Sequence, residues 1–225
     1  MAHEELEFKF RVEDAAALAR LDAALRGPGA PPLPVVRQVN RFFDTAGRAL
    51  GRAEQILRLR EEEGRFVLTA KGPGAPAEEG PLAVHAEEEV AIAPREAEAI
   101  QAGLLSPLLL LLERTGIPVP PLLEAMARDA GDEELVEVGS FTNERRRLGP
   151  LPLPGSSLAV LFELDRTSFP GGEVHCEIEV ELPSPAAAAA ARAPLFALLA
   201  AAGIPWRPST PKASRFFAIL SRRGG

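Results

Sequence analysis

Charged and apolar residues alternate one by one in short segments that recur along this chain, each about as long as a β-strand. Residues 5–12 read Glu-Leu-Glu-Phe-Lys-Phe-Arg-Val, and residues 174–182 read Val-His-Cys-Glu-Ile-Glu-Val-Glu-Leu. Shorter runs with the same alternation lie at 57–60, 68–71, 87–92 and 162–165. Because successive side chains of a strand point to opposite faces, this period of two predicts strands with one charged face and one apolar face.

Helical signals lie between these strands. Asp14 is a predicted N-cap for a helix that Gly27 ends, and Pro94 is placed to open a helix over 95–105. Ser184-Pro185 opens an alanine-rich helix that runs toward Ala202, and a less regular helical region covers 108–130. Loops are predicted at 27–34, 72–81 and 149–157. Since alternating strands lie on both sides of each loop, none of the three reads as a linker, and we expect one domain over residues 1–225.

Strands in hairpin-like succession with helices set between them indicate the α+β class. A closed antiparallel barrel is the alternative to an open sheet, because closure gives the charged face of every strand a place in the lumen.

Composition limits the classes of partner. The net charge of −7 argues against non-specific binding to nucleic acid. The longest apolar run, 104–112, is broken by Ser106 and Pro107 and falls short of the roughly 20 residues that span a bilayer. The single cysteine, Cys176, excludes an intrachain disulfide and fits a reducing, cytoplasmic compartment. We therefore expect no nucleic-acid partner and no membrane.

The charges on the predicted strands are sorted by sign. An ordinary solvent-exposed face is the simplest explanation for any one strand. However, acids recur two residues apart at Glu5/Glu7 and Glu177/Glu179, and bases do so at Arg58/Arg60. Like charges on one strand face repel each other unless a counter-ion is present. Acid pairs suit a hard cation, and arginine pairs suit phosphate oxygens, so the pattern predicts a metal–polyphosphate site.

Glu5-Leu6-Glu7-Phe8-Lys9 resembles the Glu-x-Glu-x-Lys signature of the CYTH superfamily, the triphosphate tunnel metalloenzymes. Segments similar to further family motifs follow in order: 40–45, 57–60, Lys71, 87–89, 141–147, 164–169, 177–181, and Lys212 with Arg215. The resemblance covers nearly the whole chain. It implies an eight-stranded antiparallel β-barrel, the triphosphate tunnel, with helices packed on its outside, which binds a linear triphosphate with Mg²⁺ or Mn²⁺.

The resemblance also implies roles for individual residues. The metal-binding acids would be Glu5, Glu7, Asp165, Glu177 and Glu179. The phosphate-binding bases would be Lys9, Arg58, Arg60, Lys71, Arg145, Arg147, Lys212 and Arg215. Catalytic or orienting roles would belong to Lys9, Glu87 and Asp165. Either Lys212 or Arg215 could be the C-terminal phosphate contact, and the sequence leaves that choice open.

The function implied is metal-dependent hydrolysis of a small triphosphate by a monomer or homodimer, with inorganic tripolyphosphate as the first choice of substrate. A thiamine triphosphatase is an alternative, although Gln55-Ile56-Leu57 before Arg58 offers no aromatic ring for stacking. A nucleoside triphosphatase and a class IV adenylyl cyclase are further alternatives, but the chain has no tyrosine and only one tryptophan. A non-catalytic polyphosphate-binding module is the remaining alternative.

Overall fold

The computed structural model describes residues 3–27, 29–75 and 82–223. It divides the chain into two compact units. The first unit holds residues 1–4, 37–75 and 85–142, and the second holds residues 5–36, 76–84 and 143–225.

The first unit is built on antiparallel strands. In sheet order they are β5 (Leu82–Ile92), β4 (Arg65–Ala75), β3 (Ile56–Glu62), β2 (Val36–Thr45) and the first part of β6 (Leu135–Pro152). The register pairs Leu57 with Ala70 and Leu59 with Leu68, whereas Arg58 lies opposite Thr69. Residues paired across strands share a face, so the leucines and the arginine point to opposite faces of this sheet.

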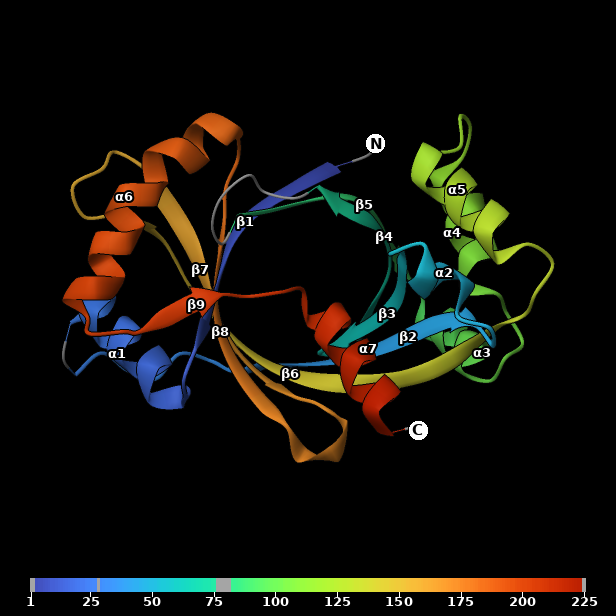
Figure 1. The fold of residues 1–225 in the computed structure, drawn as a ribbon, viewed down its shortest axis with the longest axis horizontal. Helices are drawn as coiled ribbons and strands as arrows, with labels where there is room; N and C mark the ends of the chain where they lie inside the picture. The colour runs from blue at the N-terminus through green and yellow to red at the C-terminus, as the bar shows by residue number, and fades with distance from the viewer. Residues whose placement is uncertain (1–2, 28, 76–81, 224–225) are drawn as a thin grey trace. The chain divides into compact units, whose positions relative to one another are not determined.

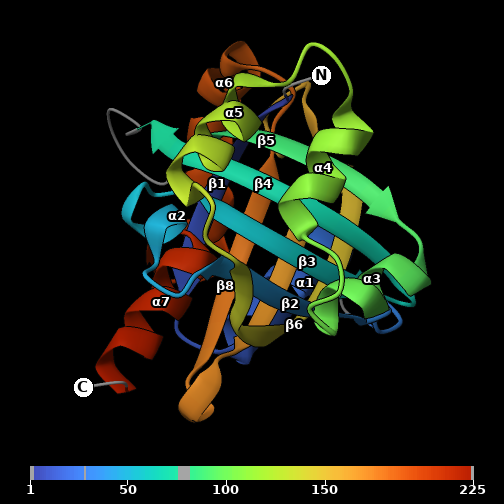
Figure 2. The ribbon, with the colours of Figure 1, turned by 90° about the vertical axis from the view of Figure 1, so that its right-hand side faces the viewer.

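Helices cover the leucine face of the first unit. They are α2 (Ala49–Arg52), α3 (Pro94–Gln101), α4 (Pro107–Thr115) and α5 (Pro121–Ala130). Figure 2 shows α4 and α5 lying across β3 and β4. Leu57, Leu59 and Leu68 are buried in one apolar core with Leu111 and Met126 of these helices. Burial of apolar side chains between helices and sheet is the main stabilising term for such a layer.

The second unit repeats this two-layer arrangement. Its strands, in sheet order, are the second part of β6, then β7 (Ala159–Ser168), β8 (Val174–Glu181), β1 (His3–Val12) and β9 (Trp206–Pro208). Its helices are α1 (Ala15–Arg26), the short 3₁₀ helix η1 (Pro170–Gly172), α6 (Pro185–Ala201) and α7 (Lys212–Arg223). Figure 1 shows α1 and α6 beside the strands of this unit. Phe8, Phe162 and Ile178 are buried in its core, together with Leu195 and Leu199 of α6.

The predicted alternation is confirmed within each unit. The apolar members of the runs enter the two cores: Leu6, Phe8, Leu57, Leu59, Leu68, Phe162, Leu164, Ile178 and Val180. The antiparallel pairing and the α+β class are also confirmed. The eight predicted strands are present, and the described residues add a ninth to the sheet order. The additional short strand, β9, pairs with β1 through Val12 and Trp206. Closure of the strands into one tunnel stays a prediction.

Several predicted boundaries are corrected. The helix over 95–105 ends at Gln101, just before Gly103, which has a φ of 72°. The helical region 108–130 is two helices, each opened by a proline, α4 and α5. Strands extend into two predicted loops, since β4 continues to Ala75 and β6 to Pro152. Residues 76–81 of the loop 72–81 lie outside the described part of the chain.

The predicted caps are correct where they can be checked. Asp14 accepts a hydrogen bond from the backbone N–H of Ala17 at 2.9 Å, and Gly27 is the C-cap of α1. Ser184 caps α6 in the same way, and that helix continues through Pro194. In the part of the chain that the structure describes, no helix has the length and apolar character needed to cross a membrane.

Candidate active site

The charged face of the second unit carries buried acids opposed to one another. The register of β7 and β8 sets Asp165 opposite Glu177 and Glu163 opposite Glu179. Like charges directly opposite across a sheet are destabilising without compensation. The compensation comes from bases on β1, β6 and α7. We call the following set the acid–base cluster: Glu7, Lys9, Arg145, Arg147, Glu163, Asp165, Glu177, Glu179, Lys212 and Arg215.

Arg145 holds three of these acids together. Its Nε and Nη2 donate to the two carboxylate oxygens of Asp165 at 2.8 and 2.6 Å, a bidentate pair. The same Nη2 donates to Glu179 at 2.8 Å, and Nη1 contacts Glu163. Arg147, one strand pleat further along β6, donates from Nε to Glu163 at 3.0 Å. A planar guanidinium with five donors suits this role, and the same fork would match phosphate oxygens.

Lys212, the first residue of α7, lies between acids of two strands. Its Nζ is 2.9 Å from Asp165 and 3.4 Å from Glu177, and it forms a shorter ion pair with Glu179. Lys9 of β1 adds a second ammonium group, 2.6 Å from Glu7 and 3.7 Å from Glu179. Both ammonium groups therefore lie among carboxylates that the sequence predicts to be metal ligands.

Arg215, one turn further along α7, holds the other side of Glu177. Its guanidinium pairs with Glu177, and its Nη1 lies 2.8 Å from Nδ1 of His175. The Cζ atom of the same guanidinium lies over the ring of Phe169, 5.5 Å from the ring centroid. Ser209 donates its hydroxyl to Glu177. Glu177 is consequently held in place by three contacts from the C-terminal segment.

Burial and charge act in opposite directions on the acids of this cluster. Burial alone would raise the pKa of Asp165, but the charges of Lys212 and Arg145 outweigh it and hold that pKa below its ordinary value. Burial opposes ionisation of Glu179 in the same way, and Lys212, Lys9 and Arg145 lower its pKa well below the ordinary value. Both groups are therefore carboxylates at neutral pH.

Glu163 behaves differently although it contacts the same arginine. Burial raises its pKa, and the neighbouring charges of Glu179 and Asp165 raise it further against the opposing effect of Arg145. The pKa of Lys212 is raised, because the three carboxylates around its ammonium group outweigh the effect of burial. The cluster thus favours fully charged lysine beside ionised Asp165 and Glu179.

The first unit carries a separate set on its charged face, which we call the arginine cluster: Arg58, Arg60, Thr69, Lys71, Glu87 and Glu89. Arg58 donates to the Thr69 hydroxyl at 3.1 Å and lies 3.4 Å from Glu89. Arg60 reaches the same Glu89 oxygen at 3.3 Å, and Lys71 lies 3.0 Å from Glu87. Burial raises the pKa of Glu89, but Arg60 and Arg58 outweigh it and lower that pKa overall.

An aromatic pair lies on the same face as the arginine cluster. Phe42 of β2 is directly opposite Arg58 in the register. Its ring is tilted against the ring of Phe141 of β6, and the two ring centroids are 5.3 Å apart. Both rings are buried. They belong to the segments that resemble family motifs, and their burial leaves no open ring face.

The adjacent motif residue Asp44 has a structural role. Its carboxylate accepts backbone N–H groups from Thr45, Leu50 and Gly51 at 2.8–3.0 Å. These bonds cap the four-residue helix α2. Asp44, in the segment 40–45, therefore joins the end of β2 to α2.

The predicted site residues divide between the two clusters. The second unit holds Glu7, Lys9, Arg145, Arg147, Asp165, Glu177, Glu179, Lys212 and Arg215, and the first holds Arg58, Arg60, Lys71 and Glu87. Glu5 lies in β1 by its backbone, but its side chain is outside the described residues. Sequence reasoning gave no site role to Glu163, Ser209 or His175. For Glu163 a signal was present, because it lies two residues before Asp165 and shares its face.

The acid set fits a hard divalent cation by chemistry. All of its donors are carboxylate oxygens, the ligands that Mg²⁺ and Mn²⁺ prefer. Among the described residues, however, no three Asp, Glu, His or Cys side chains are grouped so that they enclose an ion. The carboxylates are instead spaced around Lys212 and Arg145. Metal binding would therefore require these acids to exchange ammonium or guanidinium partners for the ion.

Comparison with solved structures gives matches over nearly the whole chain. A proposed adenylyl cyclase from Hippeastrum, described as having a dominant triphosphatase activity, is 26% identical, with a TM-score of 0.73 and 95% of each chain covered. A proposed adenylate cyclase from Bacillus halodurans is 22% identical, with a TM-score of 0.63 and coverage of 95% of this chain and 97% of that one. The PH1819 protein from Pyrococcus horikoshii is 16% identical, with a TM-score of 0.53 and coverage of 91% and 94%.

No curated protein sequence matches this chain. The family model of the CYTH domain matches residues 3–206, a range that includes strands of both units and most of both clusters. On that match, the chain belongs to the CYTH domain family.

Proposed function

We propose that this protein hydrolyses a small triphosphate with the help of divalent metal ions, and that inorganic tripolyphosphate, cleaved to pyrophosphate and phosphate, is its substrate. One observation carries the proposal. Buried carboxylates on β7 and β8 are neutralised by basic side chains that reach in from β1, β6 and α7. Membership of the CYTH family and the triphosphatase activity described for the Hippeastrum relative agree with this reading.

The proposed roles follow the two clusters. Glu5, Glu7, Asp165, Glu177 and Glu179 would hold Mg²⁺ or Mn²⁺. The bases of both clusters would bind phosphate oxygens: Lys9, Arg58, Arg60, Lys71, Arg145, Arg147, Lys212 and Arg215. Between the two C-terminal bases, Lys212 is the better candidate for phosphate contact, because it is a point charge that lies among the proposed metal-binding acids Asp165, Glu177 and Glu179. Arg215 is committed to Glu177, His175 and Phe169.

Catalysis of phosphoryl transfer to water depends mainly on positioning and charge neutralisation. The bound metal ions would supply positive charge next to the phosphate oxygens and activate water. Lys9 and Arg145 would bind phosphate oxygens once Glu7 and Glu179 hold the metal ions. Asp165, which is fully buried, would keep Arg145 and Lys212 oriented, and Glu87 would do the same for Lys71 at 3.0 Å.

The choice of tripolyphosphate rests on what surrounds the arginine cluster. The residue before Leu57 is Ile56, and the aromatic pair Phe42/Phe141 on that face is buried. Neither offers an exposed ring on which thiamine or a nucleobase could stack. A cyclase would have to hold the ribose of ATP so that its 3′ hydroxyl attacks the α-phosphorus, with pyrophosphate leaving.

Phosphate release decides among these activities. Purified protein should release phosphate from tripolyphosphate in Mg²⁺ or Mn²⁺ faster than from ATP or thiamine triphosphate, and EDTA should abolish the release. Cyclic AMP formed from ATP would identify a cyclase. Binding of tripolyphosphate without any hydrolysis in either metal would identify a non-catalytic module. Equal hydrolysis with and without EDTA would contradict the metal-dependent reaction.

The two units act together as one CYTH domain over residues 1–225. The protein works as a monomer or homodimer. It resides in the cytoplasm, for which the support is the single, buried cysteine Cys176.

A further inference from the structure

Helix α4 is apolar on more than one face. Residues 108–112 are five consecutive leucines, a run longer than one helical turn. Leu108, Leu110 and Leu111 point into the core of the first unit, whereas Leu109 is 65% exposed. A helix that is apolar all round is normally covered on all sides. The sheet covers the inner side of α4 and α5 packs beside it, whereas Leu109 is left exposed.

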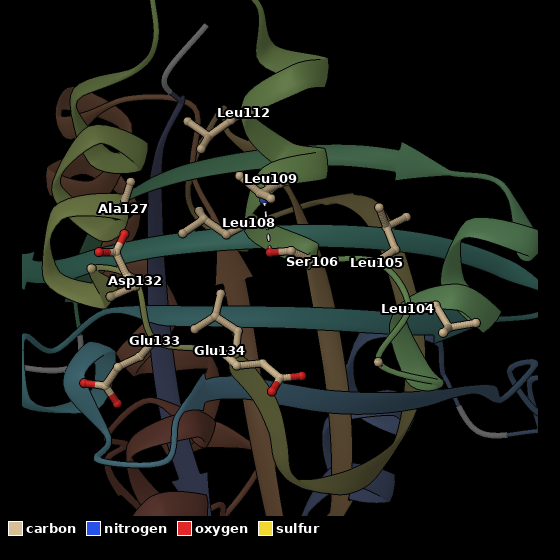
Figure 3. A pocket seen from close by; sticks show the side chains of 14 residues that line it. Leu104, Leu105, Ser106, Leu108, Leu109, Leu112, Ala127, Asp132, Glu133 and Glu134 are labelled. Atoms are coloured by element: carbon tan, nitrogen blue, oxygen red, sulfur yellow. Dashed lines mark hydrogen bonds between the residues drawn. The ribbon is translucent and has the colours of Figure 1, made fainter.

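A cavity opens beside α4. It has a volume of about 340 Å³ and lies between the α3–α4 turn, α4, the end of α5 and the beginning of β6. Leucine is the commonest residue in its wall, and Figure 3 shows Leu105, Leu108, Leu109 and Leu112 there. Leu104, at its edge, is 83% exposed. Large apolar side chains in an open hollow mark an interaction site more often than an ordinary surface does.

The rim of the cavity is acidic. Asp132, Glu133 and Glu134 follow one another between α5 and β6, and Figure 3 shows the carboxylates of Glu133 and Glu134 along one edge of the pocket. All three residues are exposed. Within the described residues, none of the three forms an ion pair. Three adjacent negative charges beside an apolar hollow are complementary to a ligand that is both apolar and cationic.

The cavity is separate from the proposed triphosphate site. Leu108 shares its core with Leu57, Leu59 and Leu68, which lie on the face of the sheet opposite to Arg58. The arginine cluster is therefore on the other side of the sheet. A ligand in this cavity would contact neither Arg58 nor Lys71.

We propose that this leucine cavity with its acidic rim binds a basic amphipathic helical segment of a partner protein. An apolar side chain of the segment, such as leucine, would enter the cavity between α4 and α5. Lysine or arginine residues one turn away would pair with Glu133 and Glu134. Leu104 and Leu109 extend the apolar surface beyond the cavity itself, which suits a helix face better than a compact small molecule. An anionic membrane surface would be repelled by the same acids.

Three labelled peptides test the charge and apolar requirements. The first is an amphipathic helix of leucine and lysine. The second replaces every lysine by glutamate, and the third replaces every leucine by serine. Fluorescence anisotropy with the full chain should show binding of the Leu/Lys peptide only, weakened by added salt. Equal binding of the Leu/Glu peptide would overturn the role of the acidic rim. Equal binding of the Ser/Lys peptide would overturn the role of the cavity.

Variants locate the binding on the protein. Leu104→Ser with Leu109→Ser, and separately Glu133→Lys with Glu134→Lys, should each weaken binding of the Leu/Lys peptide by about tenfold or more, which equals about 1.4 kcal/mol. These side chains are exposed, so thermal unfolding should show an intact fold in each case.

Matched controls lie in the same unit but outside the cavity. Ile117→Ser removes an apolar side chain that is 98% exposed, and Glu98→Lys reverses an exposed charge on α3. Both controls should bind the Leu/Lys peptide as well as the unmodified protein does. If they weaken binding as much as the cavity variants, or if the cavity variants bind normally, the proposed site is wrong. Neither outcome depends on triphosphatase activity.

Discussion

Asp165 is the residue at which the charge balance of the second unit can be tested most directly. It is fully buried and pairs with Arg145 and Lys212. Removing one member of a buried ion pair leaves the other charge uncompensated. We expect Asp165→Asn to lower the free energy of unfolding by about 3–5 kcal/mol, measured by urea denaturation without metal or substrate.

A matched control uses a carboxylate–arginine pair on the same two strands. Glu144 and Arg166 are 3.4 Å apart, with side chains 44% and 38% exposed. Glu144→Gln should therefore lower the free energy of unfolding by less than about 1 kcal/mol. Equal losses for Asp165→Asn and Glu144→Gln would mean that burial adds nothing to the importance of Asp165.

His175 predicts a pH dependence of stability. Burial and the charges of Arg11 and Arg215 lower its pKa from 6.5 to about 4, so the folded state favours the neutral ring. The unfolded chain binds this proton at higher pH than the folded chain does, and stability is lost as pH falls from 6.5 towards 4. In His175→Gln the fall in melting temperature over this window should be smaller. If the melting temperature of His175→Gln falls with pH as steeply as that of the unmodified protein, other groups cause the pH dependence.

Asp165 and Glu179 affect stability in a lower pH range than His175 does. Their lowered pKa values mean that the stability they contribute is present above their ordinary pKa values of 3.8 and 4.5. It is lost as pH falls through the lowered values of the folded state. The contribution of His175 is therefore separable from theirs in a pH titration of the melting temperature.

Glu88 is an acid on the apolar side of β5. It is 4% exposed, and its Oε1 has no hydrogen-bond partner among the described residues. Its neighbours Glu87 and Glu89 face the arginine cluster instead. Burying an unpartnered polar atom costs about 1–3 kcal/mol, so Glu88→Leu should raise the melting temperature. The control Glu98→Leu, at an exposed position, should change it little, and a fall in Glu88→Leu would reveal a hidden partner.

The sequence predicted which side chains share a face, but it did not predict which of them touch. Period two is enough to place Glu177 and Glu179 on one face. The contact of Lys212 with both depends on where α7 begins, and no alternation marks that helix. For Glu88, alternation indicates the apolar face of its strand but not whether its carboxylate finds a hydrogen-bond partner there.

At the scale of elements, the segments predicted well are those with their own local signal. Strands with several alternating residues and helices with a cap were found, as for α1 between Asp14 and Gly27. Two of the elements that were missed, α2 and β9, depend on tertiary contacts. α2 has four residues and is held by the carboxylate of Asp44, and β9 has three residues paired with β1. Such short elements do not form in isolation.

Gly149 of β6 predicts a strong local constraint. Its φ is 118°, and an added Cβ would lie 2.7 Å from the backbone N of Leu151 and from the backbone O of Val160. Side-chain-bearing residues rarely adopt this conformation, and neither contact can yield because both are backbone atoms. We expect Gly149→Ala to lower the melting temperature clearly, measured by circular dichroism.

The control for this substitution is Gly155→Ala in the following turn. Gly155 also has a positive φ, 74°, but nothing lies within 4 Å of its added Cβ. Its alanine variant carries the conformational strain without the clash and should lose less stability. If the two variants lose equally, strain alone accounts for the cost at Gly149.

At the scale of the whole molecule, the open question of function is whether the arginine cluster and the acid–base cluster bind the same ligand. The sequence predicts that their charged groups share one lumen, and that expectation stays a prediction. A ligand that binds only the folded state stabilises it by about 2.7 kcal/mol at a hundredfold excess over its dissociation constant. Tripolyphosphate with Ca²⁺, used as a non-catalytic ion, should therefore raise the melting temperature. Pyrophosphate should raise it less, because it presents fewer phosphate groups to the bases.

Substitutions in each unit turn this into the decisive measurement. Arg60→Gln removes a base of the first unit and Lys9→Gln removes one of the second, and each should reduce the tripolyphosphate-induced rise by weakening binding. Arg166→Gln, a partly exposed arginine outside both clusters, should leave the rise unchanged. If one triphosphate spans both clusters, tripolyphosphate should raise the melting temperature of the double variant Lys9→Gln with Arg60→Gln no more than pyrophosphate does. A full response in Arg60→Gln would show that the first unit takes no part in holding the triphosphate, and the arginine cluster would then need another ligand.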